Sequence, residues 1–274
     1  MGNRLTVYEK AMPDSLSWRE RLEAAGEAGF DALELSIDES DRRLARLDWS
    51  REQRQALFIL SRETGIPIQS ICLSAHRKYP LGSEDDAVVR RGLEILEKAV
   101  RLSCDLGVRF IQLAGYDVYY EPSTPCTAAR FADNLRRAVD TAASWGVLLG
   151  FETMETPFMN TTEKAMAYVK AVRSPYLQVY PDVGNVTNAV SDAAADLRAG
   201  EGHIFAAHLK ETRPGVFRDL HFGEGHVDFG RVTAELKRQG VRLYTAEFWY
   251  HAGDDWRTEL RKAHDFLRPF LKED

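Results

Sequence analysis

The 274-residue sequence contains only three cysteines, Cys72, Cys104 and Cys126. Three cysteines cannot all pair and none stands in a CxxC spacing, which argues against a disulfide framework and a cysteine-based metal site. No stretch approaches the run of about 18 apolar residues that a membrane span requires. The N-terminus also lacks a basic stretch leading into an apolar one. We therefore expect a cytoplasmic protein with no membrane partner.

The chain also has no excess of positive charge and no segment that reads as a linker. Its formal net charge is −6, which argues against a nucleic-acid partner, because proteins that bind nucleic acids usually carry a basic face. No low-complexity tract or block of like charge divides the sequence, and 44% of its residues are hydrophobic. We therefore expect one domain that spans residues 1–274.

What the sequence does contain is a series of short segments that are almost continuously apolar and rich in β-branched or aromatic residues. Such segments are typical of parallel strands buried on both faces. Helical apolar spacing fills the stretches between them, most clearly over residues 85–106. The eight predicted strands are residues 5–8, 32–37, 67–73, 109–114, 147–152, 177–182, 204–209 and 242–247.

Signals for helix ends agree with this alternation of strands and helices. A glycine closes the predicted helix shortly before a strand at Gly29, Gly65, Gly107, Gly146 and Gly240. Capping residues precede predicted helices at Ser50, Asp85, Thr161 and Asp228. Eight such units without a long linker favour an α/β protein built as a single (β/α)₈ TIM barrel over a doubly wound sheet. In a TIM barrel the active site lies at the C-terminal ends of the strands.

Four potential metal ligands end four successive predicted strands in the second half of the chain: Glu152, Asp182, His208 and Glu247. In a barrel those strand ends converge, so the four side chains can meet at one ion. A buried carboxylate costs several kcal/mol unless it is paired or binds a cation. Three carboxylates and one imidazole suit Mn²⁺ or Zn²⁺ best, with Mg²⁺ or Co²⁺ as alternatives. A network of ion pairs with lysines and arginines from the loops is the other interpretation.

Several longer motifs carry a specific resemblance. They are YEKA (8–11), RLDWSREQR (46–54), CLSAHRKYPLGSEDDAV (72–88), IQLAGYDVYY (111–120), YPDVGN (180–185), HLKETRPGVF (208–217) and FGEGHVDF (222–229). With these motifs the chain resembles the bacterial L-ribulose-5-phosphate (L-xylulose-5-phosphate) 3-epimerases of the L-ascorbate utilisation pathway, within the xylose isomerase-like barrel superfamily. The similarity extends from about residue 4 to about residue 267. It implies an isomerase that binds one divalent metal ion through the same four residues, takes a small phosphorylated ketopentose and forms a homodimer.

The chemistry of such a reaction explains why these residue types are needed. Epimerisation beside a ketone removes a weakly acidic C3 proton and returns a proton to the opposite face. A metal ion on the C2 carbonyl oxygen and the C3 hydroxyl stabilises the cis-enediolate, and two carboxylates serve as base and acid. We expect Glu152 and Glu247 to be the catalytic pair as well as metal ligands, whereas Asp182 and His208 mainly hold the ion. The resemblance implies the same division of roles.

The sequence leaves the phosphate site open between two basic clusters. One is Lys210, Arg213 and Arg218 after the seventh predicted strand, and the other is His76, Arg77 and Lys78 after the third. Arg213 is favoured because it is close in sequence to His208. The residues expected to bind substrate are Asn185, Arg213, His76, Lys210 and Gln112. Asn185 stands where the related ketohexose 3-epimerases carry a histidine, which fits a pentulose phosphate. Glu34 and Asp38 either bind hydroxyls or form ion pairs.

Other functions compete with this interpretation. A metal-dependent sugar or sugar-phosphate isomerase, of the hexulose-phosphate or hydroxypyruvate isomerase type, uses the same enediolate and returns the proton to another carbon. An abasic-site endonuclease needs a richer ligand cluster and a basic face. A sugar-phosphate sensor has no need of both glutamates. In a glycosidase the paired carboxylates stay free of metal. The sequence determines neither the ion in the cell nor the preferred pentulose phosphate.

Overall fold

The computed structural model describes residues 2–272, and its centre is a sheet of eight parallel strands. The strands follow one another around the sheet in the order β6-β5-β4-β3-β2-β1-β8-β7, so neighbours in sequence are neighbours in space. The strands are β1 (Arg4–Tyr8), β2 (Ala32–Ile37), β3 (Ile68–Leu73), β4 (Phe110–Ala114), β5 (Leu148–Glu152), β6 (Leu177–Val179), β7 (Ala207–Leu209) and β8 (Leu243–Ala246).

The barrel closes between β6 and β7 through two isolated parallel bridges. Val179 pairs with Ile204, and Asp182 pairs with His208. The His208 amide donates to Pro181 O over 2.9 Å, but Pro181 has no N–H to return a bond, so the ladder is interrupted at this point. The predicted strands 177–182 and 204–209 are therefore longer than β6 and β7, whereas the six other predictions match the observed strands within one residue at each end.

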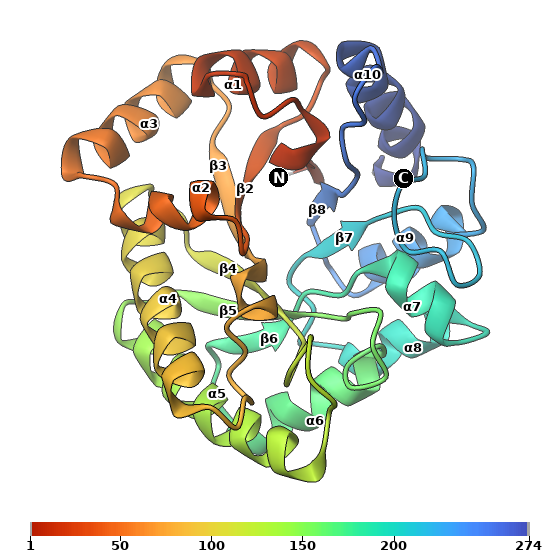
Figure 1. Ribbon diagram of the computed structural model, residues 1–274. Coiled ribbons are helices and arrows are strands. Elements are labelled where there is room, and N and C mark those ends of the chain that lie inside the picture. The colour runs from red at the N-terminus through yellow and green to blue at the C-terminus, as the bar shows by residue number, and fades with distance from the viewer. Residues whose placement is uncertain (1, 273–274) are drawn as a thin grey trace.

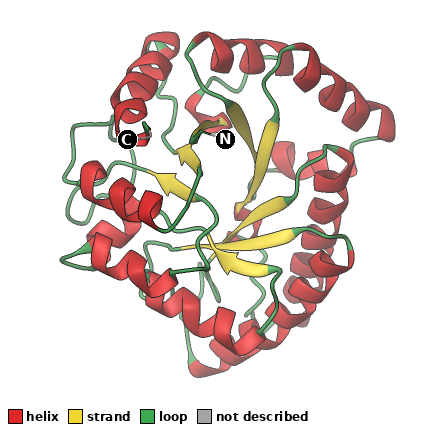
Figure 2. Cartoon of the chain, turned by 180° about the vertical axis from the view of Figure 1, so that it is seen from behind, coloured by secondary structure: helices red, strands yellow, loops and turns green. Residues whose placement is uncertain are grey.

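Helices surround the strands on the outside, as both faces of the molecule show (Figure 1, Figure 2). One or two helices follow each strand, as the (β/α)₈ prediction requires, and the TIM barrel is confirmed. The helices are α1 (Trp18–Glu27), α2 (Asp41–Leu44), α3 (Arg51–Glu63), α4 (Asp86–Asp105), α5 (Pro125–Ser144), α6 (Thr162–Val172), α7 (Val183–Ala189), α8 (Ala193–Leu197), α9 (Phe229–Arg238) and α10 (Trp256–Leu267). Short 3₁₀ turns lie at Glu9–Ala11, Ala45–Asp48, Ser74–Arg77, Arg198–Gly200 and Arg268–Leu271.

The predicted helix boundaries are confirmed at both ends of the helices. Side chains of the four predicted capping residues accept hydrogen bonds from backbone amides in the first turns of α3, α4, α6 and α9. The five predicted helix-ending glycines all have positive φ angles, between 65° and 96°. These caps fix where each chain segment turns back toward the barrel. Over residues 2–272, no helix combines the length and the apolar character needed to cross a membrane.

Most strand side chains between the sheet and the helices are apolar, but the inside of the barrel is partly polar. Leu5, Leu33, Ile71 and Leu149 are completely buried in the main hydrophobic core. Inside the barrel Ser70, Glu34, Tyr180 and Thr245 form a chain of hydrogen bonds. This polar interior lies directly beneath the strand ends that carry the predicted ligands, because Tyr180 also packs against the His208 ring with centroids 4.8 Å apart.

Candidate metal centre

The four predicted ligands meet at the C-terminal ends of β5 to β8. One ligand atom from each of Glu152, Asp182, His208 and Glu247 lies within 4.8 Å of the others, and all four side chains are buried. Glu152 is the last residue of β5 and His208 is the middle residue of β7. Glu247 directly follows β8, where its amide donates to Leu209 O over 2.9 Å. Residues at or next to the ends of neighbouring strands thus come together from four distant parts of the sequence.

Asp182 reaches the cluster from a helix cap rather than from a strand end. Its Oδ1 accepts the amide of Asn185 over 2.7 Å and so begins α7, while its own amide donates to Thr153 Oγ1 over 3.0 Å. These two bonds fix the carboxylate and leave Oδ2 directed at the cluster. Oδ2 of Asp182 and Oε2 of Glu247 are buried and lie close to positive groups, 3.0 Å from Lys210 Nζ and 3.3 Å from His208 Nδ1, respectively. Both oxygens are therefore placed where a cation is favoured.

The electrostatics of the cluster also favour a cation. Burial raises the pKa of Glu152, and the nearby Glu247 raises it further. Burial likewise raises the pKa of Asp182 to about 8, with repulsion from Glu247 and Glu152 acting against the attraction of Lys210. Burial alone would raise the pKa of Glu247, but His208 and Lys210 hold it well below its usual range. Crowded buried carboxylates of this kind are relieved by a positive ion.

The donor set fits a divalent metal ion, since it offers three carboxylates and one imidazole and no sulfur. Such a set suits hard or borderline ions of the Mn²⁺, Zn²⁺, Mg²⁺ or Co²⁺ type. With a divalent ion bound, three carboxylate charges face two positive charges of the ion. Lys210 supplies the third, because its Nζ lies 3.0 Å from Asp182 Oδ2 and 3.7 Å from Glu247 Oε2. The charges of the ion, the three carboxylate ligands and Lys210 then sum to zero.

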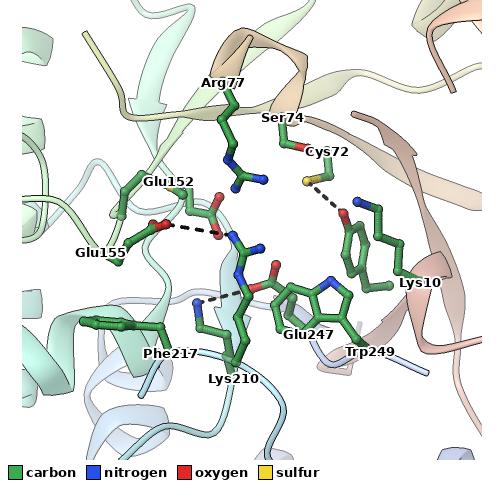
Figure 3. Close-up of a pocket in the computed structure, with 13 residues that line it drawn as sticks. Lys10, Cys72, Ser74, Arg77, Glu152, Glu155, Lys210, Phe217, Glu247 and Trp249 are labelled. Atoms are coloured by element: carbon green, nitrogen blue, oxygen red, sulfur yellow. Dashed lines mark hydrogen bonds and ion pairs between the residues drawn. The ribbon is translucent and has the colours of Figure 1, made fainter. Parts of the chain in front are cut away.

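A cleft opens above the cluster. Glu152 and Glu247 line it, but Asp182 and His208 do not. Figure 3 shows Arg77 reaching down from the loop after β3 toward Glu152, with Lys10 and Trp249 on one side and Glu155 and Phe217 on the other. The cleft is lined by four cationic side chains, Lys10, Arg77, Lys210 and Arg218, and by three carboxylates, of which Glu152 and Glu247 also face the cation site. The cleft therefore suits an anionic substrate.

The predicted substrate-binding residues lie in different places. Lys210 lines the cleft and donates to Asn185 Oδ1 over 2.8 Å. Asn185 is buried behind it, with Nδ2 donating to Thr153 O. Gln112 donates to Glu152 Oε2 from inside the barrel. These three residues surround the four potential ligands.

Arg213, the favoured phosphate ligand, and His76 do not line the cleft. Arg213 is exposed and donates from Nε to Glu224 O over 2.7 Å. His76 is buried, with Nε2 3.0 Å from Gly92 O. Arg77 and Arg218 from the same two loops line the cleft instead. The sequence predicted that one of these two loops binds phosphate. Which side chain of each loop points into the cleft depends on how the loop folds.

Glu34 and Asp38, whose roles the sequence left open, both form polar contacts within the protein. Asp38 lies 2.5 Å from Lys10 Nζ, and although burial raises its pKa, Lys10 lowers it to about 2. Asp38 thereby places the Lys10 ammonium group at the mouth of the cleft. Glu34 accepts hydrogen bonds inside the barrel and does not line the cleft.

The fold and this centre define a class of barrel proteins, and comparison with known proteins identifies it. A family model described as the xylose isomerase-like TIM barrel matches residues 22–270. The chain belongs to the xylose isomerase-like TIM barrel family. Among solved structures, D-psicose 3-epimerase from Clostridium cellulolyticum H10 matches with a TM-score of 0.83 and 16% identity, over 98% of this chain and 100% of that chain. A structure of L-ribulose 3-epimerase matches with a TM-score of 0.78 and 21% identity, over 98% of this chain and 94% of that chain.

Sequence comparison gives more specific relatives. The chain is 49% identical over 265 residues to the L-ribulose-5-phosphate 3-epimerase UlaE of Salmonella paratyphi A, covering 96% of this chain and 93% of the relative. The protein of the same name from Salmonella enteritidis PT4 matches at the same identity and coverage. These matches confirm the resemblance that the sequence motifs predicted.

Proposed function

We propose that this protein is a metal-dependent L-ribulose-5-phosphate 3-epimerase that interconverts L-ribulose 5-phosphate and L-xylulose 5-phosphate. One observation carries the proposal: of the four clustered ligands, only Glu152 and Glu247 also line the cleft. A carboxylate that borders both the ion and the substrate is placed to exchange a proton with the sugar. The relatives at 49% identity bear the name of this activity, which supports the same substrate.

In this proposal the protein groups divide the work. A divalent ion held by Glu152, Asp182, His208 and Glu247 would supply Lewis acidity to the bound ketose. One of Glu152 and Glu247 takes the C3 proton, and the other returns a proton to the opposite face. Asp182 and His208 hold the ion, since they are in the cluster but not in the cleft. The aromatic rings of Tyr8, Phe217 and Trp249 limit the access of water to the reacting carbon.

We place the phosphate group between Arg77 and Arg218. Arg77 lines the cleft, and its guanidinium packs over the Tyr119 ring at 4.8 Å, which fixes its position. The Arg218 guanidinium stacks over the Trp249 ring at 5.3 Å and lies 3.8 Å from Glu155. Two guanidinium groups from opposite loops suit the planar, bidentate recognition of phosphate oxygens. Lys10 adds a third positive charge at the same mouth.

Following the reaction by NMR in D₂O tests the proposed function. An epimerase places deuterium at C3 and retains the C2 ketone, whereas an isomerase of the same superfamily produces an aldose or moves the carbonyl group. Incorporation at C3 of L-ribulose 5-phosphate supports the proposal. Appearance of an aldose phosphate, or no exchange in protein loaded with Mn²⁺ or Zn²⁺, contradicts it. The cytoplasmic location and the homodimer stay predictions.

A further inference from the structure

A fourth buried carboxylate lies beneath the metal cluster, inside the barrel. Glu34, on β2, is completely buried, and its two oxygens have different partners. Oε2 accepts from Ser70 Oγ over 2.6 Å and from Tyr180 OH over 3.0 Å. Oε1 lies 2.7 Å from His208 Nε2. The carboxylate is therefore anchored on one side by two hydroxyl groups and presents its other oxygen to the imidazole.

The two nitrogens of His208 face opposite groups. Nδ1 lies 2.9 Å from Glu152 Oε1 and 3.3 Å from Glu247 Oε2, so it points into the cluster. Nε2 points away from the cluster, at Glu34. A metal ion needs a nitrogen lone pair, and a carboxylate needs a donor. Only an imidazole that carries its proton on Nε2 satisfies both neighbours once the ion is bound.

We propose that Glu34 is a positioning residue that holds His208 in the Nε2–H tautomer and directs Nδ1 at the metal ion. Glu34 is not itself a ligand, because it is neither among the clustered ligands nor on the wall of the cleft. The Tyr180 ring, 4.8 Å from the imidazole centroid, supports the same orientation from the side. Carboxylate partners of metal-binding histidines act in this way in other metalloproteins. The inference rests on the proposed metal site.

Two variants at position 34 separate the hydrogen bond from the packing. Glu34→Leu removes the acceptor and keeps the size of the side chain, and metal affinity should fall by about 10- to 100-fold. Glu34→Gln keeps an oxygen that can accept a hydrogen bond from His208 Nε2, so the loss of metal affinity should be smaller in this variant. The matched control is Asp117→Asn, which makes the same carboxylate-to-amide change at a buried acid that accepts from Ser123 and Thr127, not from any cluster residue. Titration calorimetry with Mn²⁺ and with Zn²⁺ measures the affinities.

A second readout does not depend on activity, and its decisive result comes from wild-type protein. Long-range ¹H–¹⁵N NMR of the His208 ring, in wild-type protein loaded with Zn²⁺, should show the proton on Nε2. In Glu34→Leu the signal should shift or become a mixture of tautomers. A proton on Nδ1 in the loaded wild-type protein overturns the inference, and this result is obtained even where Glu34→Leu fails to fold.

The affinity data can also overturn the inference. It fails where folded Glu34→Leu binds both metals within about threefold of wild type, since a lost positioning contact costs more than that. It also fails where Glu34→Gln loses as much affinity as Glu34→Leu, because the retained acceptor would then have no effect. Wild-type protein that binds neither metal contradicts the proposed metal site instead, so the two failures are distinguishable.

Discussion

The Lys210 ammonium group and the Asp182 carboxylate lie 3.0 Å apart at the base of the cleft, and both side chains are buried. Burial by itself lowers the pKa of Lys210, but Asp182, Glu247 and Glu152 raise it above its usual value, so the lysine stays charged. A permanent positive charge beside the centre repels a metal ion and attracts negative charge that develops on a substrate. Lys210 therefore has opposite effects on metal binding and on turnover.

Replacing Lys210 by Met should show these opposite effects. We expect the affinity for Mn²⁺ to stay the same or increase, because a repelling charge is lost. We expect kcat to fall by about 100-fold, the size of effect found when one preorganised electrostatic group is removed from a transition state. Lys262→Met, at an exposed position on α10, serves as the control. A parallel loss of metal and activity would show that Lys210 only supports the structure.

Glu152→Gln and Glu247→Gln test the catalytic pair. Each change removes one proton-transfer group but keeps an oxygen that can face the ion, so the fold should be retained and metal loading largely so. We expect less than about a tenth of wild-type turnover in each variant, since a positioned acid or base contributes about 10²- to 10⁴-fold. The exchange of the C3 proton with D₂O should be lost together with turnover. A variant that keeps more activity than this would exclude its residue from proton transfer.

The phosphate site is tested by two arginines of one loop. Arg218→Ala removes a guanidinium that lines the cleft, whereas Arg213→Ala removes one that does not. Charge-assisted hydrogen bonds contribute about 1.5–3 kcal/mol, so KM for L-ribulose 5-phosphate should rise by about 10- to 100-fold in Arg218→Ala. KM for unphosphorylated L-ribulose should change little in either variant. A larger effect of Arg213→Ala would place the phosphate at the site that the sequence first favoured.

His76 gives the protein a specific dependence of stability on pH. Burial lowers its pKa from 6.5 to about 4, although the contact with Gly92 O acts in the opposite direction. As the pH falls, His76 therefore binds a proton near pH 6.5 in the unfolded chain but only near pH 4 in the folded protein. The stability conferred by neutral His76 is complete above pH 6.5 and is lost as the pH falls toward 4. This loss should reach about 2 kcal/mol between pH 7 and pH 5.

Urea unfolding of wild type and His76→Gln at both pH values measures this effect. The glutamine does not titrate, so the fall in unfolding free energy between the two pH values should be smaller in the variant by about 2 kcal/mol. In the control His226→Gln, at an exposed position, the unfolding free energy should fall between the two pH values by as much as in wild type. An identical fall in wild type and His76→Gln would show that His76 becomes protonated in the folded state without cost.

The sequence predicted the barrel and the neighbourhood of the site because both follow from local patterns. Gly146 and Thr161 mark helix ends through backbone preferences that hold in any fold, and parallel strand ends always converge. Strand β6 was predicted to reach Asp182, but Pro181 interrupts its ladder, and Asp182 caps a helix instead.

The orientation of loop and interior side chains was beyond sequence reasoning. The loop after β7 takes its shape from buried Glu211, whose carboxylate accepts the backbone amides of Thr212, Gly223 and Val227. That folding turns Arg218 inward and leaves Arg213 outside. The role of Glu34 depends on its contact with His208, which is 174 residues away. Contacts of this range follow from barrel register and not from any local motif.

The central claim is that one divalent ion binds among Glu152, Asp182, His208 and Glu247. Protein stripped with EDTA and crystallised with excess Mn²⁺ gives the most direct measurement, through anomalous diffraction. We predict a single strong peak between the four side chains, at about 2.0–2.3 Å from their nearest ligand atoms. No peak there, or a peak bound by other residues, would contradict the account.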